Sequence, residues 1–241
     1  MSSLPATKTC PVTGKSGEYH PPAEGDLRSV CPAINTMANH GYIRRDGKGI
    51  TPWMMAAGLR ACYGLSTPLS LFLTIGGWFL IKRYALRALT LADIGLHGGV
   101  EHDASVVHRD CPAGQKDAPI EIIPELVDEF TRNVKDALVT NEDIVETRIR
   151  RERASPPLDP MHAEIARGEM AIILGVWARS ADGVEGVPLP WMKLWLGQER
   201  LPEGWRPDHT ETLRSVVKRA TALRTAMNKM KKEETEAAKK R

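Results

Sequence analysis

The sequence predicts an all-α protein whose helices form a single domain. Helical periodicity recurs along the chain, whereas alternating runs of β-branched and aromatic residues, the pattern typical of strands, hardly occur. Aromatic residues account for only 5% of the 241 residues. With 42% hydrophobic and 26% charged residues, the chain has the composition of a globular protein with one large core or two small ones. We expect about eight to ten helices.

Two short helices near the N-terminus have the clearest predicted boundaries. The first is expected over residues 32–40, with Pro32 at its first position and Gly41 just past its end, because proline favours a helix start and glycine a helix end. The second is expected over residues 51–62, with Thr51 as its N-cap. Further helices are expected over residues 69–92, 100–109, 124–137, 141–153, 160–179 and 209–235, with Asn141 and Asp208 or Thr210 as caps.

The net charge of +3 is unevenly placed along the chain. Residues 213–241 contain ten Lys or Arg against three Glu, a local +7, which leaves about −4 for residues 1–212. The mildly acidic body therefore offers no basic footprint for nucleic acid. We expect an N-terminal arm over residues 1–18, the folded domain over 19–212 and a basic C-terminal helix or tail over 213–241. Binding of that tail to anionic lipid or nucleic acid is a weaker alternative.

Residues 61–81 carry no charge between Arg60 and Lys82. Their length matches a bilayer span, but Gly, Ser, Thr and Pro crowd the first half, which favours a buried core helix over a membrane-associated element. The N-terminus lacks the apolar run of a secretory signal, and four cysteines are too few for a disulfide scaffold. We therefore expect an intracellular protein, soluble or peripherally bound to a membrane.

Three cysteines precede a proline, and they are Cys10, Cys31 and Cys111. Only Cys31 is followed by a predicted helix. The free N–H groups and dipole at a helix N-terminus stabilise a thiolate, which is the form of cysteine that binds metals. The residues alone leave two interpretations of Cys31, a buried structural cysteine or a thiolate ligand.

The stretch "LHGGVEHDASVVHRDC", residues 96–111, concentrates polar side chains. If it is helical, Glu101 and Ser105 share a face, and their oxygens would suit Mg²⁺ or Mn²⁺. His102, one residue further on than Glu101, would point about 100° away. A zinc site is an alternative, but it would need a bend to gather its ligands, which would be His97, His102, His108 and Cys111.

The stretch "DPMHAEIARGEMAIILGVW", residues 159–177, places Glu169 on one helical face with four apolar residues, which are Ile165, Ile172, Ile173 and Val176. Burial disfavours the charged form of a carboxyl group, so the pKa of Glu169 is expected to rise, as suits a general acid–base. A carboxylate held by a structural partner is the alternative. Glu164 is expected on the solvent face.

The segments "CPAINTMANHG" and "EHDAS", with Glu169 after them, resemble the heme-thiolate peroxidases, the family of chloroperoxidase and the fungal unspecific peroxygenases. The chain looks most like the short branch, whose pattern is Pro-Cys-Pro, then Glu-His-Asp and Ser, then a distal Glu. The resemblance spans roughly residues 19–207 and includes "RLPEGWRP", residues 200–207. Val30 stands where the family has its first proline, which would loosen the loop before the cysteine without removing it.

The resemblance implies that the helices enclose a heme b with Cys31 as its axial thiolate ligand. It also implies a Mg²⁺ (or Mn²⁺) site beside a heme propionate, formed by Glu101, Ser105 and the backbone carbonyl of His102. The expected activity is oxidation or oxygenation of small organic substrates by hydrogen peroxide.

The same resemblance implies that Glu169 is the distal acid–base and that His102, oriented by Asp103, positions it. A non-catalytic heme- or metal-binding protein is the alternative, because such a protein could use Cys31 without a distal acid. A membrane-associated interaction protein built on residues 61–81 is a third interpretation, but it leaves the polar motifs unexplained. The substrate and the oligomeric state are not predicted.

Overall fold

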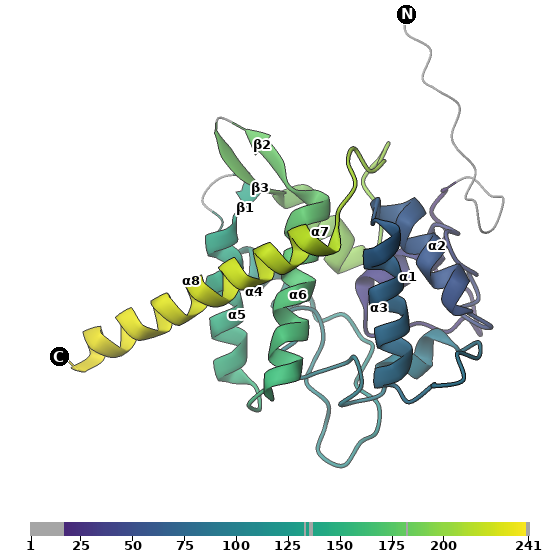
Figure 1. Ribbon diagram of the computed structural model, residues 1–241, viewed down its shortest axis with the longest axis horizontal. Coiled ribbons are helices and arrows are strands. Elements are labelled where there is room, and N and C mark those ends of the chain that lie inside the picture. Colours follow the sequence, from purple (N-terminus) through teal and green to yellow (C-terminus); the bar gives the residue numbers. More distant parts are fainter. Residues whose placement is uncertain (1–16, 133, 135–136, 182, 240–241) are drawn as a thin grey trace, which may run out of the picture.

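The computed structural model describes residues 17–132, 134, 137–181 and 183–239, and it confirms an all-α fold. Within these residues there are eight α-helices, one 3₁₀-helix and three short strands (Figure 1). In chain order they are α1 (Pro32–Asn39), α2 (Pro52–Tyr63), α3 (Thr67–Leu80), η1 (Leu91–Gly95), α4 (Pro124–Thr131), β1 (Leu138–Val139), α5 (Asn141–Ala154), α6 (Pro160–Trp177), β2 (Arg179–Ala181), β3 (Val184–Pro188), α7 (Leu189–Gln198) and α8 (Leu213–Lys239).

The strands form a small antiparallel sheet at one end of α6, in the order β1-β3-β2 (Figure 1). Val139 is opposite Val187 in one pair, and Arg179 is opposite Gly186 in the other. A Cβ at Gly186 would lie 2.8 Å from the carbonyl oxygen of Val139, so the close approach of the strands requires glycine there. The sheet joins α6 to α7 without contributing a layer to the fold.

The boundaries of α1 and α2 confirm the sequence prediction to within a residue. Cys31 is the N-cap of α1, and Gly41 follows that helix with a φ of 71°. At the start of α2, the hydroxyl of Thr51 accepts a hydrogen bond from the amide of Met54 (3.2 Å). These local signals act within a few residues, so they survive in the folded protein.

The helix expected over residues 69–92 ends much earlier, at Leu80. Lys82 adopts a left-handed conformation with a φ of 60°. The amide of Arg83 then donates to the carbonyl of Trp78 (2.8 Å), and the Trp78 indole N–H donates to the carbonyl of Arg87 (2.9 Å). This Schellman-type ending turns the chain back, so residues 82–88 form a loop.

The helix expected over residues 100–109 is wrong, because this segment is an irregular loop. Side chains outside the segment form hydrogen bonds with its backbone. Asp110 accepts from the amide of Ala104 (2.7 Å), and Arg148 donates to the Ala104 carbonyl (2.7 Å). Arg151 likewise donates to the carbonyl of Ser105 (2.7 Å). The loop is satisfied by tertiary hydrogen bonds in place of helical ones.

Smaller differences affect other helix ends. The helix expected over residues 124–137 ends at Thr131, and the one expected over 160–179 ends at Trp177. The last helix begins at Leu213, not at residue 209. Thr140, and not Asn141, caps α5, since its hydroxyl accepts from the amide of Asp143 (3.3 Å).

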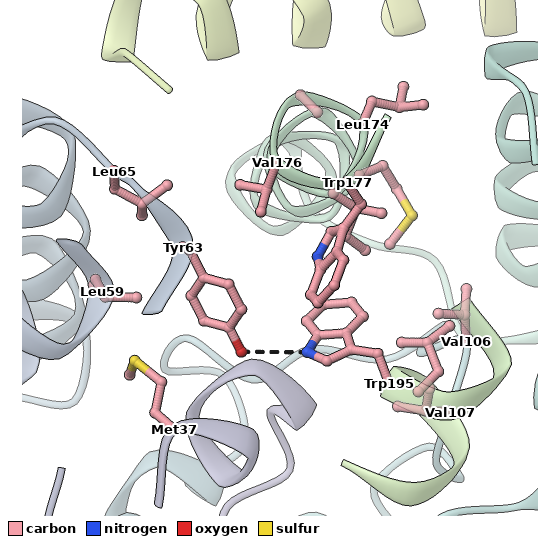
Figure 2. Close-up of a cluster of buried hydrophobic side chains, with 14 of the residues drawn as sticks. Met37, Leu59, Tyr63, Leu65, Val106, Val107, Leu174, Val176, Trp177 and Trp195 are labelled. Carbon is pink, nitrogen blue, oxygen red and sulfur yellow. Dashed lines mark hydrogen bonds between the residues drawn. The ribbon is translucent and has the colours of Figure 1, made fainter. Parts of the chain in front are cut away.

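An aromatic cluster joins the two halves of the core. Trp177 at the end of α6 stacks on Trp205 with ring centroids 4.0 Å apart. The indole N–H of Trp195 donates to the Tyr63 hydroxyl (3.2 Å, Figure 2), which donates to the carbonyl of Ala33 (2.8 Å). Elements from α1, α2, α6 and α7 therefore meet in one core, as a single domain requires.

The basic C-terminal segment folds as a long helix as far as the described residues extend. The first half of α8 packs on α6 and buries Val216, Leu223 and Met227. Its second half projects away from the body (Figure 1) and is almost entirely exposed. Among the described residues, no helix has the length and apolarity needed to cross a membrane.

Candidate functional site

Cys31 lies at the N-terminus of α1 with part of its surface accessible. Burial by the surrounding protein raises the pKa of its thiol to about 12, and the charge of Glu169 adds to this rise. The backbone amides of Ala33 and Ile34 act in the opposite direction. The helix start thus offers hydrogen-bond donors to a thiolate, but the thiolate needs a further positive charge to form at neutral pH.

Glu169 and His102 form the second part of the site. The carboxylate Oε2 of Glu169, on α6, lies 3.4 Å from the imidazole Nε2 of His102, on the loop after η1. The carboxylate raises the pKa of His102 against the opposing effect of burial. The contact therefore favours the charged form of the imidazole.

The expected rise in the pKa of Glu169 is wrong, because its pKa is lowered. Burial does act to raise it, and it is the largest single influence. The charge and hydrogen bond of His102 lower this pKa, as do the charges of Arg148 and His108, and together they outweigh the effect of burial. Glu169 is therefore a carboxylate, ready to accept a proton.

Asp103 orients His102 through its backbone and not through its carboxylate. The imidazole Nδ1 of His102 is 2.7 Å from the carbonyl oxygen of Asp103. The Asp103 carboxylate instead accepts a hydrogen bond from the amide of Cys111 (3.2 Å). This hydrogen bond links Asp103 to Cys111, eight residues further along the same loop. The link between the two residues therefore runs through the Asp103 carbonyl.

Arg148 is a site residue that the sequence analysis missed. It lies on α5, is 1% exposed, and lowers the pKa of Glu169 by its charge. It also donates to the Ala104 carbonyl, two residues after His102. A sequence signal existed, since Arg148 lies between Ile144 and Ile149 on the apolar side of a helix, where an arginine is costly without partners.

Cys31 and Glu169 lie near one another, since the charge of Glu169 raises the pKa of the Cys31 thiol. The Glu169 side chain keeps 45% of its surface accessible, and Cys31 is partly accessible, yet loss of water contact is the largest influence on both pKa values. Two hollows of about 460 and 900 Å³, the first lined by α5 and α8 and the second by residues between 18 and 46, do not include either residue.

Polar residues of α1 attach it to the segment that follows α7. The side chain of Asn35 donates to Glu199 (2.6 Å), and that of Asn39 donates to the Glu199 carbonyl (3.2 Å). His40 accepts a hydrogen bond at Nε2 from the amide of Leu201 (3.0 Å). The motifs "CPAINTMANHG" and "RLPEGWRP" are thus in contact, and their polar residues fix the direction of the helix that carries Cys31.

Glu101 is buried, with one oxygen paired and one left over. Its Oε2 lies 2.7 Å from Nδ1 of His97, while Oε1 has no hydrogen-bond partner among the described residues. An orphaned, buried carboxylate oxygen is suited to a cation. The shared helical face expected for Glu101 and Ser105 is wrong, because the segment is a loop in which the Ser105 hydroxyl accepts from the amides of Val107 and His108 (3.2 and 3.3 Å).

The zinc alternative fails in the part of the chain that the structure describes. No three His, Cys, Asp or Glu side chains of this part are grouped closely enough to hold a metal ion. The histidines point to separate partners: His97 to Glu101, His102 to Glu169 and His108 to the carbonyl of Arg109. Cys10 lies outside the described residues.

The fold and the site define an all-α protein in which a cysteine at a helix start lies near a Glu–His pair. The model of the family "Peroxidase, family 2" matches residues 17–210, so the chain belongs to that family. This family is the chloroperoxidase family, as the sequence resemblance predicted.

Curated relatives agree with the family. The chloroperoxidase of Leptoxyphium fumago is 24% identical over 220 residues, covering 82% of this chain and 59% of that protein. The aromatic peroxidase fscJ of Fusarium equiseti is 42% identical over 69 residues, covering 27% of this chain and 15% of the relative. The dothistromin biosynthesis peroxidase dotB of Dothistroma septosporum is 39% identical over 59 residues, covering 24% and 14%. The chain thus spans at most three fifths of these relatives.

Proposed function

We propose that this protein is a heme-thiolate peroxidase that uses hydrogen peroxide to oxidise or oxygenate small organic molecules. Membership of the peroxidase family supports the use of peroxide. The observation that carries the proposal is that the Glu169–His102 pair lies near enough to Cys31 for the charge of Glu169 to raise the pKa of the thiol. A peroxidase needs an electron-donating ligand and a proton carrier near one another.

The position of Cys31 at the N-terminus of α1 suits heme b. A heme iron bound at Sγ would supply the positive charge that keeps the thiolate ionised and, through that ligand, would favour cleavage of the peroxide O–O bond. The amides of Ala33 and Ile34 would share the thiolate charge. The hydrogen bonds of Asn35 and Asn39 to Glu199 would hold α1 in place while Cys31 is a ligand.

Glu169 supplies the proton transfer in this proposal. Its carboxylate accepts a proton from one oxygen of hydrogen peroxide and returns it to the other oxygen, which leaves as water. His102 keeps the carboxylate ionised beforehand and fixes its position, and the Asp103 carbonyl and Arg148 hold His102 and its loop. The reaction therefore begins with Glu169 as a base.

A Mg²⁺ (or Mn²⁺) site at Glu101 is part of the proposal. The buried, unpartnered Oε1 of Glu101 supports it, and the carbonyl of His102 and the hydroxyl of Ser105 are the further donors proposed from the resemblance. A divalent cation there would compensate the Glu101 charge and attract a heme propionate.

A non-catalytic heme carrier is the competing function, and it has no use for an ionised carboxylate beside a buried imidazole. The decisive experiment is to load the purified protein with heme and record the ferrous–CO absorption spectrum, then add peroxide and a phenolic dye. We expect the band of thiolate ligation and rapid dye oxidation. A thiolate spectrum without dye oxidation would indicate the carrier, and a spectrum of histidine ligation would contradict the assignment of Cys31.

A further inference from the structure

The outer face of α3 carries an apolar stripe in contact with solvent. Phe72 is 60% exposed and Phe79 is 52% exposed. With the half-buried Ile75 between them, their spacing of three and four residues puts them on one side of the helix. Single exposed apolar residues are common on protein surfaces, but a row that includes two phenylalanines marks a site of contact.

The loop after α3 continues this stripe. Tyr84 is 62% exposed and Leu86 is 38% exposed, and the rings of Phe79 and Tyr84 are 5.6 Å apart. Lys82 and Leu86 have φ values of 60° and 52°, a left-handed conformation that non-glycine residues rarely adopt. The loop thus adopts an unfavourable backbone conformation and still presents apolar side chains to solvent.

Trp53 lies at the same end of α3 as this loop. The backbones of Ile50 and Leu89 exchange two hydrogen bonds (2.8 and 3.0 Å), which place the start of α2 next to the end of the loop. Trp53 is 72% exposed. Tyrosine and tryptophan favour the boundary between lipid headgroups and acyl chains, because one end of each ring system is apolar and the other polar.

The charge of this region is strongly one-sided. Residues 47–92 contain five Lys or Arg and no Asp or Glu, in a body that is otherwise acidic. Lys82 and Arg87 are exposed in the loop, and Arg60 is exposed in the last turn of α2. Arg83 is also exposed but pairs with Asp93 (2.6 Å). An anionic surface complements these charges, whereas a second copy of the chain would bring like charges together.

We infer that α3 and the loop 82–88 dock this protein onto an anionic lipid bilayer. The protein lies on the membrane and does not cross it, since α3 has 14 residues and would span about 21 Å of a core about 30 Å thick. Phe72, Phe79 and Leu86 enter the boundary of the acyl chains, and Lys82 and Arg87 contact the headgroups.

The test uses the full chain and vesicles of phosphatidylcholine with and without phosphatidylserine. We expect sedimentation with the vesicles that contain phosphatidylserine, and weaker binding when salt rises from about 0.01 to 0.15 M, because salt screens the attraction. Quenching of Trp53 fluorescence by brominated lipid should accompany binding and should largely disappear in Trp53→Phe. This outcome is independent of heme loading and of peroxidase activity.

Two pairs of substitutions separate the contributions. Lys82→Gln with Arg87→Gln should weaken binding by about 25-fold, since each basic residue near the surface contributes about fivefold. Phe72→Ser with Phe79→Ser should remove binding to a similar or larger extent. Both pairs change exposed side chains, so the fold should persist, which circular dichroism would verify.

The control for charge is Lys229→Gln with Lys232→Gln on the projecting part of α8, whose side chains are 74% and 78% exposed. The control for apolar loss is Ile120→Ser, 53% exposed. Both should bind as the parent does. A larger loss in the α8 variant, or equal binding to both kinds of vesicle, would overturn the proposal. The proposal would also be overturned if the parent protein did not bind vesicles and formed a dimer that Phe72→Ser with Phe79→Ser dissociates. A second copy of the chain would then cover α3.

Discussion

The imidazole Nε2 of His102 lies 3.4 Å from Oε2 of Glu169, and this contact joins the loop of residues 96–111 to α6. Glu169 raises the pKa of His102, and His102 lowers that of Glu169, although burial acts against both shifts. Each partner therefore stabilises the charge of the other. In the proposed reaction, His102 makes Glu169 a base before peroxide arrives.

Glu169→Gln should keep the heme spectrum and lose most of the reaction with peroxide. Glutamine preserves the shape of the side chain but cannot carry a proton between the two peroxide oxygens. A general acid–base contributes about 10²–10⁴-fold, so stopped-flow rates of heme oxidation by peroxide should fall by that order. Glu164→Gln is the matched control, because Glu164 pairs with Arg167 and Arg224 at the surface. A silent Glu169 variant would place the proton carrier elsewhere.

His102→Ala should slow the same reaction by less than Glu169→Gln, because His102 positions the proton carrier and does not carry the proton. Its loss also removes a cause of the lowered pKa of Glu169, so activity should disappear at a higher pH on acidification. Asp103→Asn should leave the rate within about threefold, a difference of well under 1 kcal/mol, since the His102 partner is the Asp103 carbonyl. A large loss in Asp103→Asn would show that its carboxylate acts on the site.

Cys31→Ala should abolish the ferrous–CO band of thiolate ligation, while Cys111→Ala should keep it. Cys31 is at the N-terminus of α1, near Glu169, whereas the Cys111 Sγ lies 3.7 and 3.8 Å from the carbonyl oxygens of Gln115 and Pro112 in its own loop. Cys10→Ala is also expected to keep the band. A thiolate band that survives in Cys31→Ala would overturn the whole assignment.

Glu101→Gln should weaken the retention of heme, and treatment with a chelator should have the same effect on the parent protein. The reason is that the buried, unpartnered oxygen of Glu101 is the proposed anionic ligand of the cation beside a propionate. Glu121→Gln makes the same change at an exposed position and should retain heme normally. Unchanged heme content after both chelation and Glu101→Gln would exclude the cation site.

His40 should make the stability of the fold depend on pH. Burial lowers its pKa in the folded state, where Nδ1 lies 2.6 Å from the Gly17 carbonyl and Nε2 accepts from Leu201. A lowered pKa means that the unfolded chain binds a proton first, so the contribution is complete above about pH 6.5 and is lost as the pH falls through the folded-state pKa. The midpoint temperature of thermal unfolding should therefore fall less steeply between about pH 7.5 and 5 in His40→Gln than in the parent. Parallel curves would contradict this role.

The sequence by itself determined those features that depend on neighbours along the chain. The starts of α1 and α2 follow from a proline at the first position of each helix, joined in α2 by the Thr51 cap. Helical periodicity also predicted α6, but the face that carries Glu169 is only partly buried. The family was also recognisable, because Cys31, the Glu101–Asp103 triplet and Glu169 keep their order whatever lies between them.

Only the tertiary structure decided the conformation of residues 100–109 and the charge state of Glu169. Arg148 and Arg151 reach this loop from α5, more than forty residues later, and take the carbonyls that a helix would have used. His102 then reaches Glu169 from a distance of 67 positions in the chain and reverses the effect of burial on its pKa. Hydrogen bonds and charges between distant segments exist only after folding, so no local pattern contains them.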